Sequence, residues 1–348
     1  MEIPTLKGKL IISGYITTET GLHIGGISET LKIGGVDIQV IKDPLGRTYI
    51  PGSSLKGKIR SLLEVSEKIK EDGKEFENYT ITAKFYKIVE KEKDGKKVKE
   101  KEMVREVRVY NIYDQKEEKI KRKMDVKTKI YKENGNIEWI EEKEKNYDIN
   151  ELKLKNGEDL KEISSMPCSC GGCDICKIFG PHNSKNIIYP RRVIVRDAFL
   201  INEKTGKILT KKDENYDDYF EIKMENTIDR IKGTALNPRQ IERVVKGSKF
   251  KFEIIFNVFN EEEDIKLIKK FIKGIELLED DYLGGCGSRG YGKVKFENLN
   301  IVYRPKEYYE KESSNEKENI EKKPQKDTIN NLNELKEVID KLLINKQN

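Results

Sequence analysis

Three consecutive segments decide the fold: KFKFEIIFNVFN (residues 249–260), EEEDIKLIKKFIKGIELLE (261–279) and GGCGSRGYGKVKFENLNIVY (284–303). The first and third are rich in β-branched and aromatic residues, which predicts strands. In the second, apolar side chains recur at helical spacing, which predicts an amphipathic helix. Its expected buried residues are Ile265, Leu267, Ile268, Phe271, Ile272, Ile275 and Leu278. Strand, helix and strand in this order indicate an α+β sandwich of the ferredoxin-like kind.

The third segment opens with a glycine-rich loop that contains Gly285, Gly287, Gly290 and Gly292. A dinucleotide-binding fingerprint needs a strand before its glycines and a helix after them, and here the order is reversed. Such a loop instead lets another backbone approach closely, either protein or sugar-phosphate. Within it, Arg289 offers a cation for phosphate and Tyr291 offers a ring for stacking. The structural alternative is a tight helix-to-strand connection, which requires about two of the four glycines.

A second basic stretch is IPGSSLKGKIRSLLE, residues 50–64. Ser53 or Ser54 is the expected N-cap of a helix. Free backbone N–H groups, the positive end of the helix dipole and nearby hydroxyls all favour phosphate. The cations Lys56, Lys58 and Arg60 favour several spaced phosphates, and the Walker spacing for a nucleotide triphosphate is missing. The alternative is an ordinary capped helix with solvated lysines.

Cysteines crowd into CSCGGCDIC, which supplies Cys168, Cys170, Cys173 and Cys176. Residues this close in sequence rarely reach disulfide geometry, whereas metal ligation favours the spacing. Zinc is the expected metal, with an iron–sulfur cluster as the alternative, and His182 could replace one cysteine as a ligand. A closed site with four protein ligands leaves no position for an activated water, so its role would be structural.

The amino-acid composition limits the classes of partner that the protein can bind. The chain has 348 residues, 37% of them charged, and a net charge of +6, so any nucleic-acid site must be local. No stretch approaches the roughly 20 apolar residues that span a membrane, and the N-terminus has no signal-peptide pattern. We therefore expect a cytoplasmic protein without a membrane partner.

Several segments lie outside the predicted core. Residues 66–165 are expected to form a charged insertion of β-hairpins, lid-like, with turns at Asp94–Gly95 and Asn134–Gly135 and with Trp139 as a small anchor. Residues 166–182 form the zinc segment. Residues 224–245 are polar and contain a proline, which predicts a projecting loop before a short helix. After residue 304 we expect a charged, disordered tail that ends in one helix.

Seven collinear motifs carry a resemblance: ETGLHIGG, VIKDP, IPGSSLKGKIRSLL, VRDAFL, ENTIDRI, NPRQIERV and DYLGGCGSRGYGKVKFE. Together they resemble the repeated backbone subunit of the type III-A CRISPR interference complex, in the superfamily of repeat-associated RNA-binding proteins with RRM-like folds. The match covers residues 1–65 and 179–303, the expected RRM-like core. Neither the long insertion nor the C-terminal tail belongs to the common core.

The resemblance implies a filament of identical subunits along guide CRISPR RNA that cuts a complementary target RNA once per subunit. Lys56, Lys58 and Arg60 match the guide-binding helix, and His23 matches a histidine near RNA. Residues 224–245, with Arg230 and Arg239, match a β-hairpin thumb that kinks the guide–target duplex. Asp37 falls at the position of the cleavage aspartate, with a divalent cation, magnesium, as its expected cofactor. Further implied partners are the other subunits of this complex, which are called Csm subunits, including the one that caps the guide 5′ end.

Two competing functions stay open from the sequence. One is a non-catalytic scaffold that binds guide RNA and partner subunits while another protein cuts. The other is a guide-processing endonuclease, which would need a general base such as His23 beside the cut. An aspartate at position 37 argues against the second function, because processing relatives of this fold usually depend on histidine or tyrosine.

Overall fold

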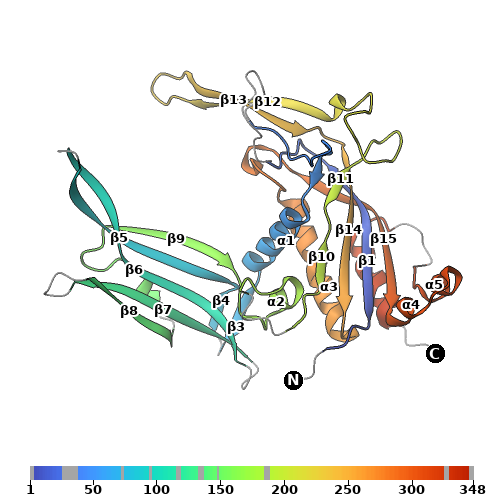
Figure 1. Ribbon diagram of the computed structural model, residues 1–348, viewed down its shortest axis with the longest axis horizontal. Coiled ribbons are helices and arrows are strands. Elements are labelled where there is room, and N and C mark those ends of the chain that lie inside the picture. The colour runs from blue at the N-terminus through green and yellow to red at the C-terminus, as the bar shows by residue number, and fades with distance from the viewer. Residues whose placement is uncertain are drawn as a thin grey trace. The chain divides into compact units, whose positions relative to one another are not determined.

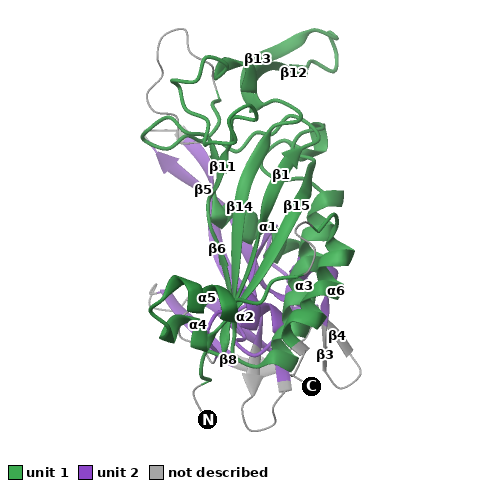
Figure 2. Cartoon of the chain, turned by 90° about the vertical axis from the view of Figure 1, so that its right-hand side faces the viewer, with its two compact units in different colours: residues 1–62, 192–348 green, residues 63–191 purple. Residues whose placement is uncertain are grey.

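The computed structural model describes the chain apart from residues 1–3, 26–37, 72–73, 94–95, 115–118, 132–136, 147–148, 184–188, 325–328 and 345–348. The chain divides into two compact units (Figure 2). One unit consists of residues 1–62 and 192–348, and the other consists of residues 63–191. The second unit therefore contains both the charged insertion and the cysteine segment.

An antiparallel sheet forms the centre of the first unit, with strand order β15-β1-β14-β11-β2 and with β10 also paired to β14 (Figure 1). Its strands are β1 (Gly8–Thr18), β2 (Tyr49–Ile50), β10 (Val193–Val195), β11 (Ala198–Leu200), β14 (Lys249–Val258) and β15 (Val294–Pro305). The turn chemistry of Asp43–Gly46 also predicts a hairpin of residues 36–42 with 47–50, and among the described residues of these two segments one bridge joins Lys42 to Thr48. β2 pairs instead with β11.

The topology is that of a ferredoxin-like fold. β1 is antiparallel to both β14 and β15, so these two strands run parallel, and α3 (Glu261–Asp280) connects them. α1 (Gly52–Ser66) lies in the chain between β1 and the strands β10 and β11, with β2 before it and the rest of the second unit after it. This β-α-β-β-α-β arrangement confirms the predicted α+β, RRM-like class.

Helix α3 confirms the periodicity argument in detail. Every apolar position expected to face the core is buried, from Ile265 to Leu278. The helix begins after Asn260, whose side chain accepts the N–H of Glu263 as an N-cap. Sequence pattern and capping chemistry therefore agree on where this helix lies.

A two-stranded hairpin, β12 (Phe220–Ile228) with β13 (Ala235–Val244), projects beyond one end of the sheet in Figure 1. The predicted short helix after Pro238 is wrong, because these residues pair with β12 as a strand. A proline fits there because the register shifts opposite it, between Glu225 and Thr227. Asn237 beside it has a positive φ of 52°.

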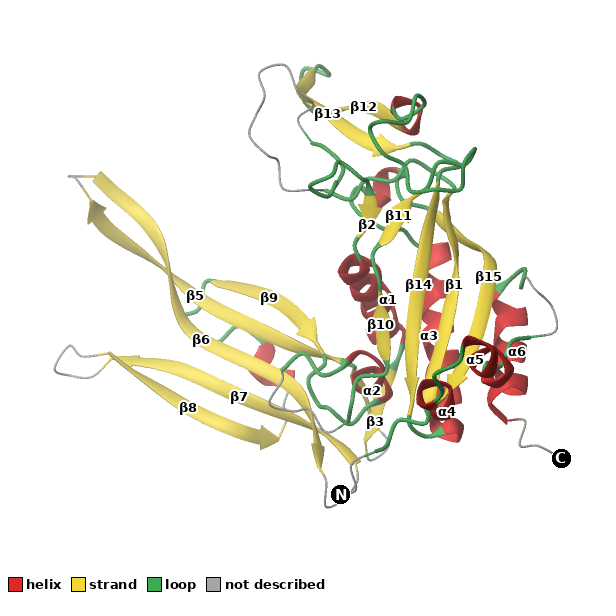
Figure 3. Cartoon of the chain, turned by 45° about the vertical axis from the view of Figure 1, so that its right-hand side comes forward, coloured by secondary structure: helices red, strands yellow, loops and turns green. Residues whose placement is uncertain are grey.

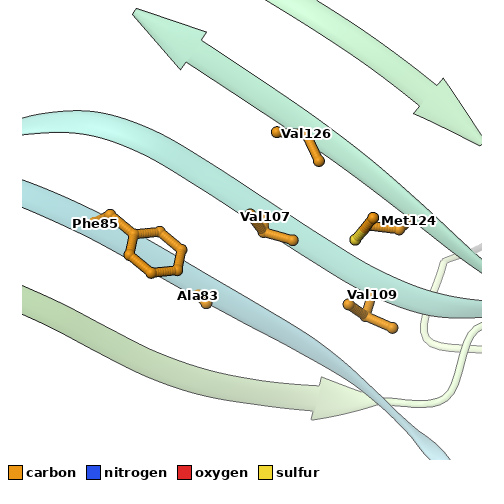
Figure 4. Packing of buried hydrophobic residues seen from close by; sticks show 6 residues of the cluster. All are labelled: Ala83, Phe85, Val107, Val109, Met124 and Val126. Carbon is orange, nitrogen blue, oxygen red and sulfur yellow. The ribbon is translucent and has the colours of Figure 1, made fainter. Parts of the chain in front are cut away.

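The second unit is built on an antiparallel sheet of order β8-β7-β6-β5-β9. Its elements are β3 (Lys68–Glu71), β4 (Lys74–Glu77), β5 (Tyr79–Lys93), β6 (Lys96–Asp114), β7 (Lys119–Tyr131), β8 (Ile137–Asn146), β9 (Leu160–Pro167) and α2 (Asp174–Phe179). The pairings β5–β6 and β7–β8 confirm the two predicted hairpins. Six side chains on one face form its core (Figure 4): Ala83, Phe85, Val107, Val109, Met124 and Val126. Trp139 is 39% exposed and is not the anchor.

The C-terminal segment corrects the expectation of a disordered tail. It contains α4 (Lys306–Glu310), α5 (Ser314–Ile320) and α6 (Leu332–Ile344), all visible in Figure 3. Main-chain bridges join Lys322 to Tyr303 and Ile329 to Leu299, so the tail runs along β15. α6 buries Leu335 and Ile339, and its charged side chains pair with α3. The high charge content of this segment led to the prediction of disorder, but a charged segment can still bury one apolar stripe of a helix.

Within the described residues, we find no helix with both the length and the apolar character needed to cross a membrane.

Candidate RNA-binding surface and metal centre

The start of α1 is capped by a residue distant in sequence. Gly52 N–H donates to Asp197 Oδ1 at 2.7 Å, and the N–H groups of Ser54 and Leu55 donate to Pro51 O. Ser53 and Ser54 lie inside the helix, so the prediction that one of them is the N-cap is wrong. A carboxylate already occupies the positive end of the dipole, which weakens the case for a phosphate on these amides.

The three cations of α1 do not share one face. Lys58 Nζ lies 3.0 Å from Asp281 Oδ2 and 3.8 Å from the centroid of the Tyr282 ring, at the start of the glycine-rich loop. Successive helical residues rotate by about 100°, so Lys56 and Arg60 share a face about 200° from Lys58. Lys58 therefore connects α1 to the loop, and Lys56 with Arg60 offers a separate cationic face.

Internal packing explains part of the glycine-rich loop. A Cβ on Gly287 would lie 2.0 Å from the Tyr282 ring, so the protein itself fills the space that the missing side chain leaves. Gly290, by contrast, has a φ of +83° and no atom within 4 Å of a built Cβ. The structural and the binding interpretations of this loop thus apply to different glycines, and Gly285 and Gly290 leave the more open backbone.

Tyr291 does not present its ring for base stacking, contrary to the prediction. It is 1% exposed, and its ring lies against Arg243 at 4.9 Å and Lys223 at 4.5 Å. Burial, with a contribution from the Glu225 carboxylate, raises the pKa of Tyr291 to about 12. This tyrosine is a structural element beneath the loop.

Arg289 is half-exposed and bridges the loop to the hairpin. Its Nε lies 3.1 Å from Glu225 Oε2 on β12, and its Nη2 donates to Cys286 Sγ at 2.6 Å. Arg239 on β13 lies 3.8 Å from the same carboxylate oxygen and is 45% exposed. Arg230, in the turn of the hairpin, is exposed. Arg289 and Arg239 therefore share the Glu225 carboxylate between the loop and the hairpin, whereas Arg230 lies in the turn at the hairpin tip.

His23 is buried between that hairpin and the loop. Its Nδ1 lies 2.7 Å from the carbonyl oxygen of Glu242, which can only accept, so we assign the proton to Nδ1. The carbonyl of His23 in turn accepts the N–H of Gly285 at 2.8 Å. His23 is only 5% exposed, so it holds the neighbouring segments in place and has little surface left for contact with RNA.

Asp37, the expected cleavage residue, lies outside the described residues. The next residue, Ile38, is described, and it forms a parallel bridge with Ile241 on β13.

The four cysteines form a buried cluster whose sulfur atoms all lie within 4.8 Å of one another. The Cys170–Cys176 and Cys168–Cys173 Sγ···Sγ distances are 3.9 Å. Tetrahedral zinc with Zn–S bonds of about 2.3 Å requires Sγ···Sγ distances of about 3.8 Å. The cluster could hold a metal such as zinc. His182 is exposed and does not belong to this group, so the four thiols are the candidate ligand set.

Electrostatics within the cluster also favour a cation. Hydrogen bonding with Cys168 lowers the pKa of Cys170, whereas contact with Cys168 raises the pKa of Cys173. Four sulfur atoms this close cannot all be thiolates unless a positive ion lies among them. N–H groups of Cys173 and Cys176 each approach a cysteine sulfur at 3.4 Å, as metal-bound thiolates require.

A second layer ties the cluster to the sheet of its own unit. Asn111 on β6 donates from Nδ2 to Cys168 Sγ at 3.9 Å, and Arg122 on β7 donates to Asn111 Oδ1 at 3.0 Å. The Arg122 side chain is 1% exposed. Its buried positive charge would offset part of the negative charge of four thiolates.

Sequence reasoning missed two residues of this region, Asp197 and Glu242. Asp197 caps a helix 145 residues away, and Glu242 holds Val40 across 202 residues. Each is an isolated acid within a mixed segment, so no local pattern distinguishes it from a solvated charge.

A known protein family and named proteins resemble this chain over most of its length. Residues 15–295 match the model of the RAMP superfamily. A protein of Methanocaldococcus jannaschii named CRISPR system Cms endoribonuclease Csm3 is 44% identical over 98% of this chain and 97% of its own. A Streptococcus thermophilus protein of the same name is 34% identical over 84% of this chain and 88% of its own. The crystal structure of a Csm3–Csm4 subcomplex of the type III-A CRISPR-Cas interference complex is 34% identical, covers 97% of both chains and has a TM-score of 0.48. The chain belongs to the RAMP superfamily and, within it, to the Csm3 family of CRISPR systems.

Proposed function

We propose that this protein is the backbone subunit of a type III-A CRISPR complex, which polymerises along guide RNA and cleaves complementary single-stranded target RNA at regular intervals. The observation that carries the proposal is identity of 44% along nearly the whole length of a relative named as an endoribonuclease. Its partners are guide RNA, target RNA, further copies of itself and the other Csm subunits, including the one that caps the guide 5′ end.

Guide RNA is held by two cationic elements. Lys56 and Arg60 on α1, with the hydroxyls of Ser53 and Ser54, bind phosphates of the guide. Arg289 and the open backbone at Gly285 and Gly290 bind a neighbouring stretch. Lys58, already paired with Asp281, orients the loop toward α1 and adds little direct binding.

The hairpin β12–β13 acts as the thumb. Its tip combines the exposed apolar side chains of Ile228 and Ile231 with the cation of Arg230, which suits insertion between stacked bases beside a phosphate. Displacing one nucleotide from the duplex would leave the adjoining phosphodiester free to adopt an in-line geometry.

Cleavage then takes place at Asp37. Its carboxylate accepts the proton of a ribose 2′-hydroxyl, the 2′-oxygen attacks phosphorus, and the bond from phosphorus to the 5′-oxygen breaks. The products are a 2′,3′-cyclic phosphate and a 5′-hydroxyl, whose proton comes from water. A divalent cation, magnesium, would neutralise charge on the phosphate.

The cysteine cluster binds structural zinc. Four thiolates close the coordination sphere, so the ion supports the fold of residues 63–191 and takes no part in cutting. His182 stays outside the ligand set. The insertion 66–165, the zinc segment 166–182 and the tail 304–348 are additions to an RRM-like core of residues 1–65 and 179–303.

The deciding experiment reconstitutes the complex with wild-type protein and with Asp37→Ala. We expect the variant to bind guide and target RNA with unchanged affinity and to lose target cutting by at least about 10³-fold, because a general base is removed. Equal loss of binding and cutting would remove Asp37 from the catalytic role. Absence of cutting by the wild-type complex would favour the scaffold function.

A further inference from the structure

Glu242, at the base of the hairpin β12–β13, holds residues 38–42 through both its main chain and its side chain. Its N–H donates to Ile38 O at 2.9 Å, and Ile38 N–H donates to Gln240 O at 3.2 Å. Its carboxylate accepts the N–H of Val40 at 2.9 Å on Oε2 and Lys42 Nζ at 3.0 Å on Oε1. The side chain is 14% exposed, so these charge-assisted bonds are largely shielded from water.

Both strands of the hairpin take part in this attachment. Lys42 Nζ lies 4.6 Å from the ring centroid of Phe220, the first residue of β12, and 5.9 Å from that of Tyr216. The ammonium group is therefore enclosed by two aromatic rings and one carboxylate. A lysine in this position fixes the segment to the hairpin and is poorly placed to bind a phosphate.

The same residue also reaches the glycine-rich loop. The carbonyl of Glu242 accepts the Nδ1–H of His23 at 2.7 Å, and the carbonyl of His23 accepts Gly285 N–H at 2.8 Å. A Cβ on Gly284 would lie 2.2 Å from that His23 oxygen, so the contact requires glycine there. Through two hydrogen bonds, the hairpin base is linked to the loop that we assign to guide binding.

A two-stranded hairpin is marginally stable alone, so its base must be fixed by neighbours. Here the neighbour is the chain that continues directly from Asp37, since Ile38 follows it by one peptide bond. Any tilt of the hairpin at its base therefore acts on the main chain at Ile38. Such a connection transmits position, because four hydrogen bonds must move together, two of which form the parallel bridge between Ile38 and Ile241.

We propose that Glu242 is a positioning residue that couples the seating of the hairpin on the guide–target duplex to the placement of the chain at Ile38. The inference rests on the proposed function, in which the adjoining Asp37 does the cutting. In this scheme only a correctly seated hairpin fixes the main chain at Ile38, so the coupling restricts cutting to properly paired target. Glu242 touches neither the substrate nor the reacting atoms in this scheme.

The test uses the complex assembled on guide RNA and measures single-turnover cutting separately from target affinity. We expect Glu242→Gln, which keeps an acceptor for Val40 N–H, to slow cutting about tenfold. Glu242→Leu removes both side-chain bonds, and we expect it to slow cutting about a hundredfold. The Kd for target RNA should change by less than about twofold, since the guide-binding cations are untouched.

A matched control is Glu221→Gln. Glu221 lies on β12 of the same hairpin and its carboxylate pairs with Arg243 at 2.6 Å, so the control removes one charge and one ion pair without touching residues 38–42. It should cut at the wild-type rate. If it slows cutting as much as Glu242→Gln, the effect comes from charge on the hairpin and the inference is wrong.

Asp37→Ala in the same assay separates the two proposals. If Asp37→Ala cuts normally, the proposed function itself fails. If Asp37→Ala is inactive while both Glu242 variants cut at the wild-type rate, the positioning role alone is refuted. Parallel loss of target binding and cutting in the Glu242 variants would also refute it, because that result indicates a purely structural residue. Should Glu242→Leu fail to assemble, the nearly isosteric Glu242→Gln decides.

Discussion

Two antiparallel hairpins of this protein share one architecture and differ in surface. The long pair β5–β6 carries charged side chains toward its tip, where Lys91 and Lys93 both pair with Glu100 across the strands. The pair β12–β13 carries more exposed large apolar side chains than β5–β6, where Ile88 and Val98 are 42% and 40% exposed. Those of β12–β13 and its turn are Ile222, Met224, Ile228, Ile231 and Leu236, exposed by 43% to 95%.

The difference shows how to separate a solvated hairpin from one built for contact. Charged cross-strand pairs stabilise a two-stranded ribbon in water, and charged side chains discourage association at its edges. Exposed apolar residues on a marginal two-stranded ribbon gain nothing for the isolated subunit, so they indicate a surface that is covered in the assembly. Length and charge made the β5–β6 pair conspicuous in the sequence, yet the shorter hairpin is the better functional candidate.

Removal of the metal should have the largest effect, and it should affect the two hairpins differently. The cysteine cluster follows β9, which pairs with β5, so loss of the metal should release that edge of the sheet. We expect Cys170→Ser or chelation to cost about 4 kcal/mol of unfolding free energy. Hydrogen exchange should then rise in β5–β9 and stay unchanged in β12–β13. Bound zinc measured at one ion per wild-type chain is the accompanying check, and unchanged exchange in β5–β9 would contradict a structural metal.

A charge at the tip of the shorter hairpin should have an intermediate effect. Ile231 is 95% exposed, so Ile231→Asp should change the unfolding free energy by less than about 0.5 kcal/mol. We expect target cutting to fall about tenfold, because a carboxylate opposes insertion beside phosphates. The matched control is Val98→Asp, an exposed apolar residue near the tip of β5–β6. Equal effects of the two variants on cutting would remove the distinction between the hairpins.

Neutralising a charge on the longer hairpin should have the smallest effect. A hydrogen bond from Lys93 lowers the pKa of Glu100, so any stability from this pair is present above the unfolded pKa and lost as pH falls through the folded one. Both side chains are solvated and screened, so Glu100→Gln should leave the thermal midpoint unchanged near neutral pH. Thermal melts at several pH values and two salt concentrations test this. A clear drop in the midpoint would mean that the charged surface is organised for more than solubility.

How far the sequence predicted the molecule depended on the range of the interactions. The buried face of helix α3 was predicted residue by residue, because the periodicity of its apolar side chains is a local pattern. All four clustered cysteines were among the predicted metal ligands, since they lie within nine positions, whereas the further candidate His182 lies outside the cluster. The prediction failed at Tyr291 and at the start of α1. Whether a ring is buried, or a helix is capped by Asp197, depends on chain segments far away in sequence. No local sequence pattern indicated the role of Glu242, because its partners also lie far away in the sequence.

The tail that runs along β15 has a consequence for assembly. An open outer strand offers unpaired N–H and C=O groups to any neighbouring strand, including the same strand of another copy. Here Lys322 and Ile329 take up those groups at Tyr303 and Leu299. In the filament that we propose, a neighbouring copy therefore cannot pair with β15 at these two positions. The repeat distance between copies would then depend on side-chain surfaces and on the RNA.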